Sequence, residues 1–170
     1  LLDSLKKDKI LNAVIEELDL ADVETLHGRA EDYAKRKEYR EQFDLCVSRA
    51  VANLSTLSEY CIPFVKRNGY FVSYKSGSSD EEIQQAEKAV NILGGKIEKT
   101  DKFFITETDM GRALVNIKKI KITPAKYPRK AGMPSRDRYN MSHIKVAHKN
   151  IIKNGNTKKK REYITKSEHI

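Results

Sequence analysis

Two basic residues, Arg49 and Lys75, stand at the ends of segments that the sequence predicts to be buried β-strands. The first segment is a nearly continuous apolar run that starts at Phe43, and the second begins at Gly69. Ligands of open α/β sheets bind outside the carboxyl ends of the strands. These two cations can therefore hold a carboxylate, a phosphate backbone or a base turned out of its stack. The alternative is that both are solvated surface residues.

A carboxylate, Asp3, follows a short apolar run that we predict to be the last part of another strand. In nucleotide-binding α/β folds a carboxylate at this position accepts both hydroxyls of a ribose. The alternative is that Asp3 caps a helix that starts at Leu5. Gly28 ends a further predicted strand, 23–27, and the backbone N–H groups that follow it can meet a heterocycle.

The sequence lacks the side-chain sets that hydrolysis or nucleophilic catalysis needs. No serine, cysteine or histidine has the necessary partners, and no carboxylate pair suggests hydrolysis. The histidines and cysteines also have no metal-ligand spacing, so we expect no metal. Methyl transfer to an aromatic ring nitrogen suits such a site, because the lone pair attacks without prior deprotonation. The enzyme has mainly to align donor and acceptor in a dry site.

Strand and helix patterns alternate for about 95 residues, and two strands then follow in succession. This order predicts a parallel α/β sheet with an antiparallel edge. The predicted helices lie near 5–18, 30–37, 53–65 and 79–93, and the predicted strands near 1–4, 23–27, 43–48, 69–75, 97–105 and 112–122.

The positive charge is concentrated in the last quarter of the chain. Residues 1–123 contain 20 Lys and Arg against 21 Asp and Glu, whereas residues 124–170 contain 13 against 3. We expect a partial domain at 1–123, a basic segment at 124–136, and a basic, disordered tail at 137–170. Such asymmetry favours a polyanion such as nucleic acid as partner.

No apolar run approaches the length of a membrane span, and no signal peptide opens the chain. We therefore expect no membrane partner. Cys46 and Cys61 fall inside a strand pattern and a helix pattern, which predicts buried thiols of a reducing compartment. A cytoplasmic protein is the expectation.

Four motifs, in this order, resemble the RsmG family, which is also called GidB or glucose-inhibited division protein B. They are Leu2-Asp3-Ser4-Leu5-Lys6-Lys7, His27-Gly28-Arg29-Ala30-Glu31-Asp32, Phe43-Asp44 with Ser48-Arg49-Ala50, and Lys126-Tyr127-Pro128-Arg129-Lys130-Ala131-Gly132-Met133-Pro134. Members are S-adenosylmethionine-dependent methyltransferases that act on N7 of a guanine in 16S ribosomal RNA. The resemblance implies the class I methyltransferase fold, a Rossmann-like α/β sheet.

The resemblance also implies roles for single residues. Asp3 and Ser4 would bind the cofactor, with Asp3 on its ribose, and Ala30 and Glu31 would lie beside the adenine. Arg49 matches the family's arginine at the cofactor and is the candidate catalytic residue. The candidate RNA contacts are Lys75, Lys126, Arg129 and Lys130.

The family's first strand, its glycine-rich loop and its N-terminal helices have no counterpart in this sequence. That strand would lie between the strand ending at Asp3 and the strand starting at Phe43. We therefore expect an N-terminally truncated sheet with a gap, unpaired backbone groups on both sides of it, and no activity of the chain alone. Two alternatives stay open: a non-catalytic RNA-binding remnant, and a fragment of a dinucleotide-dependent oxidoreductase, since Asp3 at a strand end also suits NAD.

Overall fold

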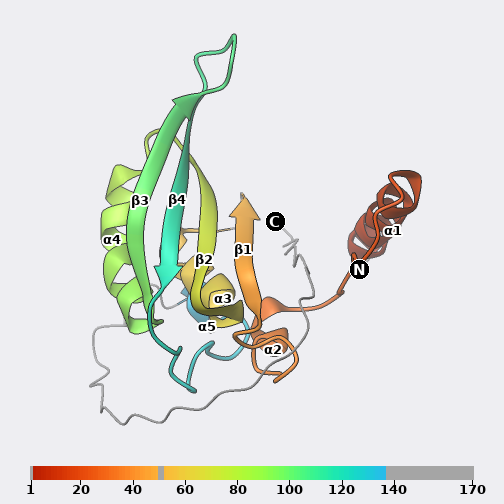
Figure 1. Ribbon diagram of the computed structural model, residues 1–170, viewed down its shortest axis with the longest axis horizontal. Coiled ribbons are helices and arrows are strands. Elements are labelled where there is room, and N and C mark those ends of the chain that lie inside the picture. Colours follow the sequence, from red (N-terminus) through yellow and green to blue (C-terminus); the bar gives the residue numbers. More distant parts are fainter. Residues whose placement is uncertain (1, 50–51, 137–170) are drawn as a thin grey trace.

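The computed structural model describes residues 2–49 and 52–136, and a four-stranded mixed sheet forms its centre (Figure 1). The strands are β1 (Phe43–Arg49), β2 (Val65–Ser76), β3 (Gly95–Phe104) and β4 (Gly111–Lys119). The helices are α1 (Leu2–Glu17), α2 (Ala30–Tyr33), α3 (Leu54–Cys61), the 3-10 helix η1 (Ile62–Phe64), α4 (Asp80–Ile92) and α5 (Met133–Arg136).

The order of the strands across the sheet is β1-β2-β4-β3. β1 and β2 are parallel, whereas β4 is antiparallel to both β2 and β3. The mixed sheet with an antiparallel edge is therefore confirmed, including the hairpin between the last two strands. Within the described residues β1 pairs with β2 alone, so the N–H and C=O groups of its other edge have no strand partner.

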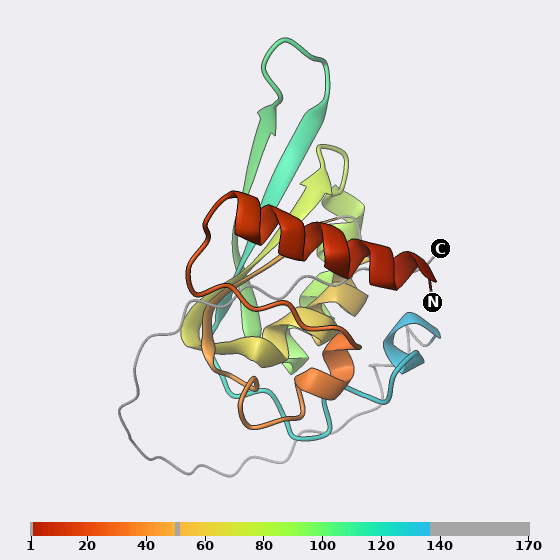
Figure 2. The ribbon, with the colours of Figure 1, turned by 90° about the vertical axis from the view of Figure 1, so that its right-hand side faces the viewer.

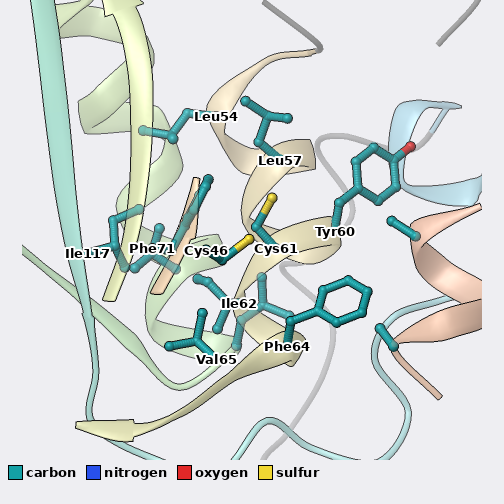
Figure 3. Packing of buried hydrophobic residues seen from close by; sticks show 14 of the residues in the cluster. Cys46, Leu54, Leu57, Tyr60, Cys61, Ile62, Phe64, Val65, Phe71 and Ile117 are labelled. Atoms are coloured by element: carbon teal, nitrogen blue, oxygen red, sulfur yellow. The ribbon is translucent and has the colours of Figure 1, made fainter. Parts of the chain in front are cut away.

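One face of the sheet is covered by α3 and α4 and holds the core. Phe71, Val115 and Ile117 project from this face and are almost completely buried. They pack with Leu54 and Leu57 of α3 in the cluster that Figure 3 shows. Burial of this apolar surface is the main stabilising term of the domain.

The other face of the sheet is more open. In the parallel register Leu45 pairs with Tyr70, and Arg49 pairs with Tyr74, so these side chains share one face. Leu45 is 43% exposed and Tyr74 is 45% exposed. The helices named above therefore cover this face less completely than α3 and α4 cover the opposite face.

The segment around α3 shows how local sequence sets the end of a helix. The side chain of Asn53 accepts a hydrogen bond from the backbone N–H of Ser55, which caps the start of α3. Pro63 cannot donate a backbone hydrogen bond, and α3 gives way to η1 at Ile62.

Two predicted strands are wrong. Residues 2–4 belong to α1, and residues 23–27 form no strand. The physical reason is that a strand needs a neighbour to pair its backbone groups, and within residues 2–49 and 52–136 no strand pairs with either segment. Figure 1 shows α1 beyond β1 and apart from the sheet, and in Figure 2, viewed from that side, α1 lies in front of the sheet. The predicted disorder of residues 137–170 lies outside the described residues.

Candidate functional site

Arg49 and Lys75 both lie at the carboxyl ends of parallel strands, but on opposite faces of the sheet. Arg49 is the last residue of β1, is exposed, and is in register with Tyr74 on the open face. Lys75 follows Tyr74 in β2, so it points to the face that α4 covers. The two cations therefore do not converge on a single ligand.

Lys75 is held inside the protein. Its Nζ donates to Glu82 Oε1 of α4 at 2.6 Å and to the carbonyl of Ala52 at 2.8 Å. The same Oε1 accepts the backbone N–H of Leu54, the first residue of α3, at 2.5 Å. These contacts tie the loop after β1 to α4. The ammonium of Lys75 is therefore occupied by hydrogen bonds within the protein and is a poor candidate for an RNA contact.

The residues that the family resemblance assigns to the cofactor are not brought together. Ala30 and Glu31 are buried at the start of α2, and Figure 1 shows α2 at the end of the sheet where β1 begins. Arg49 stands at the other end of β1, while Asp3 and Ser4 lie in α1. As arranged here, these residues do not fit one molecule of S-adenosylmethionine.

Arg129 of the basic segment is bound to a carboxylate of the core. Its backbone N–H donates to Glu59 Oε1 at 2.7 Å, and its Nη2 donates to Oε2 at 2.9 Å. Glu59 is fully buried in α3. Charge-assisted forked pairs of this kind are strong and fix geometry. The contacts of Arg129 with Glu59 anchor the basic segment to α3, and its predicted RNA contact stays a prediction.

A second buried ion pair fastens the chain just after β4. Lys119 is 1% exposed, and its Nζ donates to Glu41 Oε1 at 2.9 Å and to Thr123 Oγ1 at 2.6 Å. The backbone N–H of Thr123 donates to the same carboxylate oxygen at 2.7 Å. Burial lowers the pKa of Lys119 from its ordinary value of 10.5. This group is structural, because it faces the core and not a surface.

The remaining predicted RNA contacts, Lys126 and Lys130, are exposed. Between them Tyr127 is fully buried in the core, and burial raises the pKa of its hydroxyl. The ammonium of Lys126 lies 5.5 Å from the centre of the Tyr127 ring. The segment therefore presents two cations to solvent from a backbone that is fixed underneath.

Sequence reasoning missed the carboxylates that organise these contacts: Glu41, Glu59 and Glu82. One signal was present, because Glu59 interrupts a run of apolar and small residues in a helix that the core must bury. A charge in such a place needs a partner. The identity of that partner, 70 positions away, was not visible in any local pattern.

Among residues 2–49 and 52–136, no group of three or more His, Cys, Asp or Glu side chains could hold a metal ion. Within the same residues, no helix has both the length and the apolar character needed to cross a membrane.

Comparison with known proteins places the chain close to one family. The family model described as rRNA small subunit methyltransferase G matches residues 1–132. The ribosomal RNA small subunit methyltransferase G of Clostridium botulinum (strain Loch Maree) is 55% identical over 138 residues, which is 81% of this chain. The protein of the same name from Clostridium novyi is 54% identical over 133 residues, or 78% of this chain. The chain spans 58% and 55% of the lengths of these two relatives.

A solved structure, the M1.HpyAVI–SAM complex, aligns with a TM-score of 0.46 and 14% sequence identity. The alignment covers 59% of this chain and 55% of that one.

Proposed function

Because the chain belongs to the GidB family, rRNA small subunit methyltransferase G, we propose that it takes part in the S-adenosylmethionine-dependent methylation of guanine N7 in 16S ribosomal RNA. The identity of 55% over 138 residues to a ribosomal RNA methyltransferase carries this proposal. The oxidoreductase alternative is set aside because the matched relatives are methyltransferases. A cytoplasmic location, where ribosomal RNA is modified, belongs to the same proposal.

Arg49 is the residue that we assign to the active site. It stands exposed at the carboxyl end of β1, where ligands of open α/β sheets bind. The N7 lone pair of guanine needs no deprotonation before it attacks, so the site has to align and desolvate the reactants. A cation at a strand end can orient the RNA or the cofactor carboxylate for that step.

We further propose that residues 1–170 alone transfer no methyl group. Glu31 and Arg49 stand at opposite ends of β1, and the glycine-rich loop of the family has no counterpart in the sequence. A cofactor held by one of these residues alone stays open to water and is not fixed in line with an acceptor.

The test is incorporation of labelled methyl groups into small-subunit RNA. The chain alone should give none, and calorimetric titration should show weak binding of S-adenosylmethionine or no binding. Addition of the N-terminal part of the Clostridium botulinum relative should restore both. Tight cofactor binding by the chain alone would overturn the proposed incompleteness of the site.

Arg49→Ala in the complemented enzyme tests the assigned residue. We expect methyl incorporation to fall by at least about 100-fold, a typical cost of one group that positions charge in a transition state. Arg67→Ala is the matched control, because Arg67 is also an exposed arginine in a strand but lies near the start of β2. Equal activities of the two variants would remove Arg49 from the site.

A second function, RNA binding without catalysis, is favoured by the charge of residues 124–170, which contain 13 Lys and Arg against 3 Asp and Glu. It predicts RNA binding that weakens with salt and no methyl incorporation even after complementation. Methyl incorporation by the complemented enzyme would therefore decide between the two functions.

A further inference from the structure

Arg40 connects two basic segments of the chain, residues 35–37 and residues 126–130. They lie about 90 positions apart in the sequence. Its Nη1 donates to the carbonyl of Tyr127 at 2.8 Å and to that of Ala34 at 3.1 Å. Its Nη2 donates to the carbonyls of Thr123 at 2.8 Å and Pro124 at 3.4 Å. The planar fork of a guanidinium suits several carbonyls at once, which an ammonium at the same place cannot match.

This arrangement brings the backbones of the two segments close together. The carbonyls of Ala34 and Tyr127 accept from the same guanidinium nitrogen, so the backbones that carry Lys35 and Lys126 lie close to each other. The exposed cations in the two segments are Lys35, Arg36, Lys37, Lys126 and Lys130. The exposed acids between residues 32 and 38 are Asp32 and Glu38, so positive charge dominates.

The backbone below these cations is fixed. Tyr127 is fully buried, Glu59 holds Arg129, and Glu41 holds the N–H of Thr123. The Arg40 fork adds donors to the carbonyls of Thr123 and Tyr127, which ties this stretch of backbone to the loop after α2. The cations therefore sit on a preorganised support, which lowers the cost of ordering them when a ligand binds.

We propose that Lys35, Arg36, Lys37, Lys126 and Lys130 form one surface that binds the phosphate backbone of ribosomal RNA, with Arg40 as the residue that positions its two halves. This inference rests on the proposed function, which supplies RNA as the partner. Clustered lysines and arginines on one side of a domain are the electrostatic footprint of RNA binding. Arg36 also lies 4.6 Å from the centre of the Tyr33 ring, which orients its guanidinium.

The first test measures the affinity of residues 1–170 for a labelled fragment of small-subunit RNA at several salt concentrations. In the double variant Lys35→Gln/Lys37→Gln, the slope of log affinity against log salt should flatten by roughly 0.7 for each lysine. Lys9→Gln/Lys88→Gln is the matched control, since it removes the same charge from exposed positions on α1 and α4. Equal slopes for the two variants would overturn the surface.

The second test separates positioning from charge. Arg40→Lys keeps the charge but loses the fork, and the affinity for RNA should still fall. In the wild-type background Lys35→Gln/Lys37→Gln and Lys126→Gln/Lys130→Gln should be coupled, and in the Arg40→Lys background they should become additive. Additive effects in both backgrounds would show that Arg40 does not position the two halves. An unchanged circular dichroism spectrum of Arg40→Lys would exclude unfolding as the cause of the lost affinity.

The third test checks the class of partner. Any binding of the protein to vesicles containing phosphatidylserine should be the same for the wild type and for Lys35→Gln/Lys37→Gln. If they bind with the same dependence as RNA, the assignment to RNA is overturned. Because these measurements use binding, they can fail while methyl incorporation by the complemented enzyme succeeds, so the surface and the proposed function are judged separately.

Discussion

The N-terminal segment 2–29 and the sheet region 43–119 both contain regularly spaced apolar residues, but they bury them very differently. In α1, Ile10 is 62% exposed, whereas in β4 Ile117 is 1% exposed. Both side chains have the same volume and the same transfer free energy. The difference shows that an apolar pattern stabilises a fold only where a second layer of structure covers it.

The largest expected effect comes from Ile117→Ala. The substitution leaves a cavity under α3 and α4, and we expect the free energy of unfolding to fall by about 2–5 kcal/mol. Urea denaturation monitored by circular dichroism measures it. A loss below about 1 kcal/mol would mean that the buried side of the sheet is loosely packed, and the contrast with α1 would disappear.

A smaller effect is expected from Glu82→Gln, which weakens the tie between β2, α3 and α4. The amide can still accept from the N–H of Leu54, but Lys75 loses its ionic partner at 11% exposure. We expect a loss of about 1–3 kcal/mol in the same assay. Asp80→Asn is the control, because its ion pair with Lys102 is exposed and should contribute less than about 1 kcal/mol.

Lys119→Met tests the buried ammonium through pH. Burial lowers the pKa of Lys119 in the folded state, so the native protein releases this proton before the unfolded chain does. The contribution of Lys119 to stability therefore rises as the pH increases from the lowered pKa toward 10.5. The stability of the wild type relative to Lys119→Met should increase over this alkaline range.

The control for this experiment is Lys99→Met. Lys99 is exposed, and its hydrogen bond to Asp101 raises its pKa above 10.5, so it adds no such rise below that value. If the free energy of unfolding depends on pH in the same way for both variants, burial does not lower the pKa of Lys119 in the folded state.

The smallest effect is expected from Ile10→Ala in α1, which repeats the substitution made at Ile117. We expect a change within about 0.5 kcal/mol, since the side chain is largely exposed and alanine favours helix. Urea denaturation again provides the measurement. If Ile10→Ala lowers the free energy of unfolding as much as Ile117→Ala does, the apolar side chains of α1 are covered in solution. The comparison between the two regions then fails.

The sheet from Phe43 onward could be predicted because its signals are local. Each of the alternating strand and helix patterns depends on a few neighbouring residues. The segment 23–27 had an equally strand-like pattern and forms no strand. Pattern alone could not predict this, because strand formation depends on a neighbouring strand that the local sequence does not describe.

The candidate site was predicted less well for a similar reason. The position of Arg49 at a strand end followed from the pattern of β1. The opposite orientation of Lys75 depended on the register of β2, and its partner Glu82 depended on the packing of α4. Ion pairs such as Arg129 with Glu59 join positions far apart in the chain, so single-sequence patterns cannot identify the partners.

The two cysteines of the chain, Cys46 and Cys61, can report the opening of the domain through the rate at which their thiols are labelled. Neither cysteine forms a disulfide, and Figure 3 shows both side chains in the core between the sheet and α3. No cysteine lies in α1. A thiol reagent can modify them only when the layers separate. The rate of labelling therefore reports the lifetime of the closed sheet region and is insensitive to fraying of the N-terminal helix.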